Sequence, residues 1–163
     1  MTTSQPRHAR TPADLATRDV VLSMSGMDFV QAMLRGDLAS PPIARTLNFT
    51  LTQASPGTVR FTGTPGFDHT NPMGAIHGGW YGAILDSALG CAVMTVVPKG
   101  FWYTTLEYKV NITRALPPGM QAVAEAHVQH AGRSTAVAEA TLRGAADGKV
   151  YATGSTTCII LPG

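Results

Sequence analysis

The stretch that decides the fold runs from Asn71 to Val97 and reads NPMGAIHGGWYGAILDSALGCAVMTVV. From Gly78 onward it predicts about five turns of helix with no polar face, and Asp86 is the only charged residue. Such a helix needs cover on every side, so we expect it at the centre of the fold. A lone carboxylate in an apolar interior is costly, which makes Asp86 a candidate functional residue. The alternative for Asp86 is a backbone cap or an ion pair with Lys109 or Arg114.

The segments around this helix alternate apolar and polar residues, which is typical of strands with one buried face. Two such segments precede the helix and four follow it, over residues 46–51, 58–63, 105–113, 121–129, 135–143 and 149–161. Short turns rich in Gly and Pro join them, which favours an antiparallel sheet with the helix on one face. Alanines on the inner faces of 121–129 and 135–143 allow a curved sheet to approach the helix closely. The class is therefore α+β, and a sheet that covers half of the helix leaves the rest for another subunit.

The residues before the sheet predict a shorter helix within 25–38, which Ser25 caps and Gly36 ends. Residues 40–45, SPPIAR, are interpreted as a linker. We expect residues 1–20 to be a disordered tail and residues 21–163 to form a single domain. The N-terminus has no continuous apolar segment of the secretory kind, so we expect a cytoplasmic protein.

The composition argues against several classes of function. Charged residues make up 13% of the 163 residues, the net charge is only +2, and no basic cluster supports nucleic-acid binding. A membrane span through the central helix is disfavoured, because an Asp at its middle costs about 3 kcal/mol to insert. Cys91 and Cys158 stand in apolar segments without metal-ligand spacing, so we expect buried thiols, no metal and no cofactor.

The helix start offers a second chemical feature. The N–H groups of Gly78 and Gly79 have no acceptor within the helix, and the helix dipole favours negative charge beside them, as an oxyanion hole requires. Equally, glycine at a helix start has a purely structural role in many proteins. Gly78 and Asp86 are about 12 Å apart along one helix, too far to contact one carbonyl carbon. Two antiparallel helices about a two-fold axis bring them together, so the spacing predicts a homodimer with two equivalent sites.

Three neighbouring residues have both functional and structural interpretations. Asn71 orients a water or a carbonyl, or else only makes the turn before Pro72. His77 donates a hydrogen bond to its own loop or to a substrate. Trp80 belongs to an aromatic group that lines an aryl or acyl pocket or else packs in the core; its other members are Tyr81, Phe101, Trp102 and Tyr103.

These residues resemble the hotdog-fold acyl-CoA thioesterases of the PaaI type and their 4-hydroxybenzoyl-CoA thioesterase relatives. The resemblance rests on the pattern N…G.IHGG……D…G, on TLEYKVNITRALPPG, and on the later GR and DGKVYATGS. It covers about Pro42 to Gly163. It implies a curved six-stranded sheet around a central helix, dimers paired edge to edge, and tetramers built as dimers of dimers.

The resemblance also implies residue roles. Asp86 matches the acidic residue that attacks the thioester or activates water, and Gly78 matches the backbone donor that polarises its carbonyl. Asn71 and His77 match the loop residues that hold water or carbonyl. Thr105 matches a Ser or Thr that assists the carboxylate, with Thr104 as the fallback. The residues that match a strand segment contacting CoA are Gly132, Arg133 and Ser134.

The implied activity is hydrolysis of aryl or short to medium acyl-CoA esters to the free acid and CoA. Two alternatives stay open. One is a hotdog hydratase or dehydratase acting on acyl thioesters, and the other is an acyl-CoA-binding protein without catalysis. The sequence does not distinguish CoA from an acyl carrier protein, or direct attack by Asp86 from activation of water.

Overall fold

The computed structural model describes residues 7–163. Its centre is an antiparallel sheet with the strand order β1-β2-β4-β5-β6-β3. The strands are β1 (Phe49–Ser55), β2 (Thr58–Gly63), β3 (Phe101–Ile112), β4 (Ala122–Ala131), β5 (Thr135–Gly144) and β6 (Val150–Pro162). The predicted six strands are confirmed, although the first begins at Phe49 instead of residue 46.

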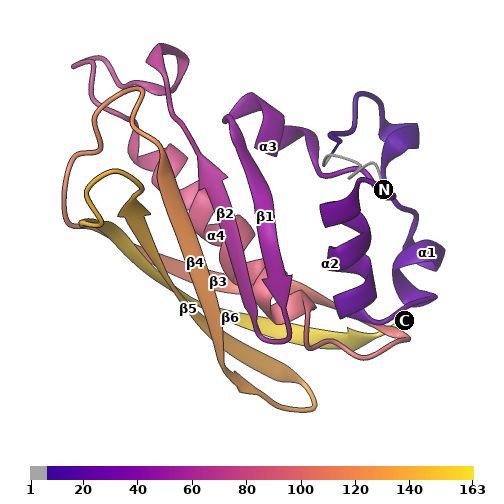
Figure 1. The fold of residues 1–163 in the computed structure, drawn as a ribbon. Helices are drawn as coiled ribbons and strands as arrows, with labels where there is room; N and C mark the ends of the chain where they lie inside the picture. Colours follow the sequence, from indigo (N-terminus) through magenta and orange to yellow (C-terminus); the bar gives the residue numbers. More distant parts are fainter. Residues whose placement is uncertain (1–6) are drawn as a thin grey trace.

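The predicted central helix is α4 (Gly78–Met94), and the curved sheet wraps around it (Figure 1). Its buried residues point in all directions, as the absence of a polar face predicted. The inner positions of β4 and β5 are alanines with almost no exposed surface, which allows the strands to lie close to α4. This arrangement is the hotdog fold, so the predicted fold class is confirmed.

Three short helices precede the sheet: α1 (Arg18–Leu22), α2 (Gly26–Arg35) and α3 (Pro42–Thr46). In Figure 1, α2 and α3 lie beside β1, and α1 lies on the side of α2 away from β1. The predicted ends of α2 are confirmed, with Ser25 as its N-cap and Gly36 at φ 81° as its C-cap. Gly26 lies against the end of α4, since a Cβ there would be 1.8 Å from the Met94 carbonyl oxygen. Its N–H donates to the Val97 carbonyl at 2.9 Å, which fixes α2 on the central helix.

The interpretation of residues 40–45 as a linker was wrong, because α3 occupies most of this segment. Proline stands at the first helical position, where its missing N–H and fixed φ favour helix initiation. The Leu47 N–H donates to the Ile43 carbonyl at 2.9 Å, so Leu47 ends this helix and does not belong to β1.

The expected disorder of residues 1–20 partly concerns residues 1–6, which lie outside the described residues. Residues 7–20 instead have a defined path that includes the 3₁₀ turn η1 (Pro12–Asp14). The physical reason is pairing with the chain before α3. Ala9 N–H donates to the Ser40 carbonyl at 2.9 Å, and Ala9 is 1% exposed.

Strand β3 forms one edge of the sheet. Leu106, Tyr108 and Ile112 lie in the predicted alternating segment 105–113 and have exposed fractions of 58%, 48% and 49% in this single chain. A bulge interrupts the pairing with β6 between Thr105 and Glu107. An edge with free backbone groups and exposed apolar side chains is a surface that another strand can pair with.

Across residues 7–163, none of the helices has both the length and the apolar character needed to cross a membrane.

Candidate active site

Asp86 lies in the third turn of α4 and is partly exposed. Burial raises the pKa of its carboxyl, and a hydrogen bond with the Thr105 side chain acts in the opposite direction. None of the ion pairs found within residues 7–163 includes Asp86, so Lys109 and Arg114 do not neutralise it. A carboxylate of this kind is a stronger base than an exposed one and is available to a substrate.

The structure selects Thr105 over Thr104 as the residue beside the carboxylate. Thr104 is exposed, whereas Thr105 is partly buried and reaches Asp86 from β3. The β3 bulge begins at Thr105, and bulges commonly redirect side chains next to active sites.

A cavity of about 260 Å³ opens beside Asp86. Its lining is largely apolar and includes no Lys, Arg or His; the residues are Met33, Ser40, Pro41, Ile43, Ala44, Phe49, Leu51, Phe61, Asp86, Ser87, Cys91, Tyr103 and Thr105. Burial, with the nearby Asp86 charge, raises the pKa of the Cys91 thiol to about 12. That thiol stays protonated near neutral pH, so Cys91 is a poor rival to Asp86 as the nucleophile.

His77 is the N-cap of α4, and its Nδ1 accepts a hydrogen bond from the Gly79 N–H at 2.9 Å. The ring is therefore the neutral tautomer with its proton on Nε2, where it acts as a donor. This contact also occupies the Gly79 N–H, which leaves Gly78 as the better oxyanion donor of the predicted pair. The Gly78 N–H has no acceptor within the helix or among the backbone contacts of residues 7–163.

Asn71 builds the loop before α4. Its side-chain oxygen accepts from the N–H groups of Met73 at 2.9 Å and Ala75 at 3.2 Å. The turn-making interpretation of Asn71 is therefore correct, and only its amide NH₂ remains for a substrate. Trp80 does not fit its predicted contact with substrate. It is 1% exposed, and its indole N–H donates to the Leu47 carbonyl at 2.7 Å, so it belongs to the core.

The predicted CoA contacts, Gly132, Arg133 and Ser134, form the exposed turn between β4 and β5. This turn lies at the Thr105 end of the sheet, because Ile159 of β6 pairs with both Thr104 and Thr135. The turn is held by the Gly132 N–H, which donates to the Thr135 carbonyl at 2.8 Å.

The candidate residues of the single chain therefore form two separate groups, which are called half-sites below. Asp86, Thr105 and the cavity form one, and His77, Gly78 and Asn71 form the other at the start of α4. The second half-site lies near the far end of β3, since a Cβ on Gly78 would be 3.5 Å from Ile112 Cδ1. Within the single helix α4, the Asp86 carboxylate and the Gly78 N–H are too far apart to contact one carbonyl carbon.

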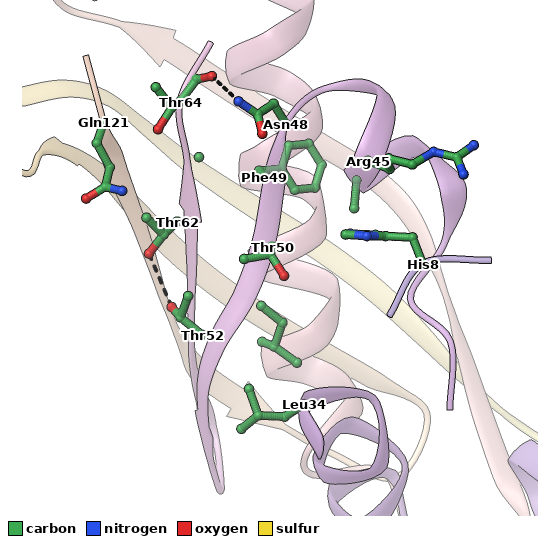
Figure 2. A pocket seen from close by; sticks show the side chains of 13 residues that line it. His8, Leu34, Arg45, Asn48, Phe49, Thr50, Thr52, Thr62, Thr64 and Gln121 are labelled. Carbon is green, nitrogen blue, oxygen red and sulfur yellow. Dashed lines mark hydrogen bonds between the residues drawn. The ribbon is translucent and has the colours of Figure 1, made fainter. Parts of the chain in front are cut away.

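A larger hollow, of about 640 Å³, lies on the outer side of β1 and β2 (Figure 2). Threonines from both strands line it, with His8 and Arg45 at its rim. It contains neither Asp86 nor any residue of the α4 start, and it is open to solvent. Its size alone does not make it the reaction site, so the smaller cavity at Asp86 is the candidate.

The sequence did not point to the N-terminal wall of this cavity. Met33, Ile43 and Ala44 look like ordinary apolar residues, and Ile43 and Ala44 were placed in a linker. Pro42 followed by apolar residues was the available sign of a short helix, but nothing local indicated which cavity that helix borders.

Comparisons with known proteins show what this fold and these two groups of residues resemble. The sequence profile of the Thioesterase superfamily matches residues 73–151. A search of curated proteins finds no significant match.

Three solved structures illustrate the likeness. A thioesterase family protein from Silicibacter pomeroyi is 29% identical with a TM-score of 0.69, over 75% of this chain and 90% of the other. A phenylacetic acid degradation-related protein from Ralstonia eutropha is 26% identical with a TM-score of 0.73, over 80% and 98%. A Streptococcus mutans protein bound to acetyl-CoA has the same fold, with 23% identity and a TM-score of 0.64 over 71% and 90%. The predicted resemblance to PaaI-type hotdog thioesterases is therefore confirmed.

Proposed function

We propose that this protein hydrolyses acyl-CoA thioesters at two equivalent sites between the subunits of a homodimer. The observation that carries the proposal is Asp86, an unpaired, partly buried carboxylate that lines an apolar cavity together with Thr105. The acyl class is aryl or short to medium chain, and CoA is taken as the carrier because the Streptococcus mutans protein of the same fold is bound to acetyl-CoA.

In this mechanism the Gly78 N–H of one subunit polarises the thioester carbonyl that faces Asp86 of the other. The ionised Asp86 attacks the carbonyl carbon, or removes a proton from a water that does so. The C–S bond breaks, the thiolate of CoA takes up a proton, and the oxygen of water ends in the released acid. The His77 Nε2–H and the Asn71 NH₂ are additional donors beside Gly78. Arg133 and its neighbours Gly132 and Ser134 are kept as the proposed contacts to CoA.

Strand β3 supports the dimeric arrangement. Thr105, beside Asp86, and Ile112, beside Gly78, lie seven residues apart on the same edge strand. Antiparallel pairing of two β3 strands about a two-fold axis near Tyr108 sets the Thr105 end of one against the Ile112 end of the other. The same pairing covers the exposed side chains of β3. Further assembly into tetramers stays a prediction.

The two alternative functions have less support. A hydratase or dehydratase needs a base beside the substrate's β-carbon, whereas the His77 Nδ1 is occupied by the Gly79 N–H. A binding protein has no need of a carboxylate that burial makes costly. Loss of absorbance from enoyl-CoA substrates tests the first alternative directly.

The test is thiol release from acetyl-, hexanoyl-, phenylacetyl- and hydroxybenzoyl-CoA by wild type and Asp86→Asn. We expect kcat/KM to fall by about a hundredfold or more in the variant, as for loss of a general base or nucleophile. Asp37→Asn is the matched control, since Asp37 is an exposed carboxylate paired with Arg35. No release by wild type, or equal rates for wild type and Asp86→Asn, would disprove the proposal.

A further inference from the structure

The cavity at Asp86 has a wall that comes from the chain before the sheet. Met33 of α2 and Ile43 and Ala44 of α3 line it, opposite residues of α4 and β3. Met33 and Ala44 are 7% and 2% exposed, so they belong to the packed interior. The profile of the Thioesterase superfamily begins at residue 73, so this wall lies outside the part of the chain that the profile matches.

The wall is held in place by specific contacts. The start of α2 is fixed to the end of α4 through Gly26, as described above. The end of α3 is fixed by the Trp80 indole N–H, which donates to the Leu47 carbonyl at 2.7 Å. The Gln31 side chain also bonds the Ala54 carbonyl of β1 at 2.9 Å, so α2 is tied to the sheet edge. A fixed wall sets a definite limit to what the cavity can hold.

The size and chemistry of the cavity indicate its occupant. An apolar cavity of about 150 Å³ accommodates one benzene, and a water-sized group takes about 30 Å³. The volume of about 260 Å³ therefore fits one aromatic ring with a short extension, or roughly eight chain carbons. No cationic residue lines it, and Asp86 repels a second carboxylate, so acyl groups with a negatively charged end are disfavoured.

Ala44 has a particular place in this wall. It lines the Asp86 cavity and also the outer hollow of Figure 2, so it separates the two spaces together with Phe49 and Leu51. A larger side chain at position 44 would take volume from the cavity. The adjacent Arg45 lines only the outer hollow.

We propose that α2 and α3 close the acyl pocket and set the longest acyl chain accepted, with Ala44 and Ile43 as the residues that determine chain length. The occupant is a neutral acyl group of up to about eight carbons. The inference rests on the proposed function for its location but concerns specificity and not catalysis.

The experiment measures kcat/KM for a series of straight-chain acyl-CoAs from acetyl to dodecanoyl. We expect wild-type kcat/KM to decline beyond octanoyl-CoA. Ala44→Leu lowers the octanoyl-to-butyryl ratio of kcat/KM by at least about tenfold, since even one methylene of pocket space counts for this much. Ile43→Ala shifts the preference toward decanoyl- and dodecanoyl-CoA. Ile43 is 48% exposed, so this variant keeps the test valid where Ala44→Leu fails to fold.

Arg45→Leu is the control, because it places a leucine on the same helix outside the cavity, and we expect it to leave the chain-length profile unchanged. Calorimetric binding of the same acyl-CoAs to Asp86→Asn carrying each substitution separates binding from turnover. If the wild type shows no turnover but acyl-CoA binding still weakens beyond the same chain length, the result contradicts the proposed function and leaves the inference about the pocket intact. Variants that alter all chain lengths equally, in turnover and in binding, overturn the inference.

Discussion

At the scale of single residues, the catalytic role proposed for Asp86 comes at the expense of stability. An unpaired carboxylate in an apolar helix is energetically costly, and for this reason the sequence alone indicated a functional role for Asp86. The structure gives the physical basis of the cost, since burial raises the pKa of the carboxyl. Thr105 was harder to identify, because the sequence alone did not separate it from Thr104. Only the pairing of β3 with β6, with its bulge after Thr105, decides which threonine reaches the carboxylate.

The raised pKa of Asp86 has a definite sign in its effect on folding. The folded protein binds a proton more tightly than the unfolded chain, so stability falls as pH rises from the unfolded pKa through the higher folded pKa. Above both values the folded state carries the full cost of the buried charge. We therefore expect Asp86→Asn to melt a few degrees higher than wild type at pH 7.

Thermal unfolding of both proteins between pH 4 and pH 8 checks this prediction. The difference in Tm should shrink as the pH falls through the raised pKa of Asp86, because the carboxyl then becomes protonated in the folded wild type. A variant that melts lower than wild type at pH 7 would show that the charge is compensated in the folded state.

At the scale of elements, the long helix α4 was predictable from the sequence, whereas the short helix α3 and the path of the N-terminal residues were not. Helix α4 has 17 residues and is apolar on all sides. A segment of this length and composition is typical of a buried helix, so it was predictable from the sequence. Helix α3 has only five residues and two neighbouring prolines, which locally look like a linker. Residues 7–9 pair with the chain at Ser40, and no local pattern in the sequence indicates such contacts.

Edge strand β3 makes a prediction about assembly. Leu106 is 58% exposed in the single chain, and a lysine at an edge position is a common means of preventing strand pairing. We expect wild type to be at least a dimer and Leu106→Lys to shift toward the monomer, with a loss of thioesterase activity of about tenfold or more as the two half-sites separate.

Light scattering coupled to size-exclusion chromatography measures this directly, and circular dichroism confirms that the variant is folded. Lys99→Leu, in the exposed segment between α4 and β3, is the control for a surface change outside the edge. A monomeric wild type with full activity would contradict the interface site.

At the scale of the whole molecule, the arrangement of the two half-sites predicts complementation between inactive variants. Gly78 is the first residue of α4, where proline is tolerated and lacks only the N–H. The preceding His77 has an extended backbone, as a residue before proline requires. Gly78→Pro thus removes the proposed oxyanion donor with little change to the helix, and we expect activity to fall by about a hundredfold or more.

Mixing Gly78→Pro with Asp86→Asn, after partial unfolding and refolding together, should restore about a quarter of wild-type activity. Random pairing makes half of the dimers mixed, and each mixed dimer contains one site with both native residues. Gly78→Ala keeps the N–H and serves as the control that separates loss of the donor from added bulk. Absence of restored activity would place both residues of each site in the same subunit.

The alanines inside β4 and β5 also bear on how this protein can diverge. Ala122, Ala124 and Ala126 face α4 with no exposed surface, and Ala136 and Ala138 do the same from β5. Any larger residue there pushes the sheet from the helix, which costs about 1–3 kcal/mol for each overpacked position. The alanine positions that cover this side of α4 therefore tolerate few substitutions by larger residues. New substrate ranges are more accessible through the short helices at the N-terminus, where a single exchange alters the space available without disturbing the rest of the core.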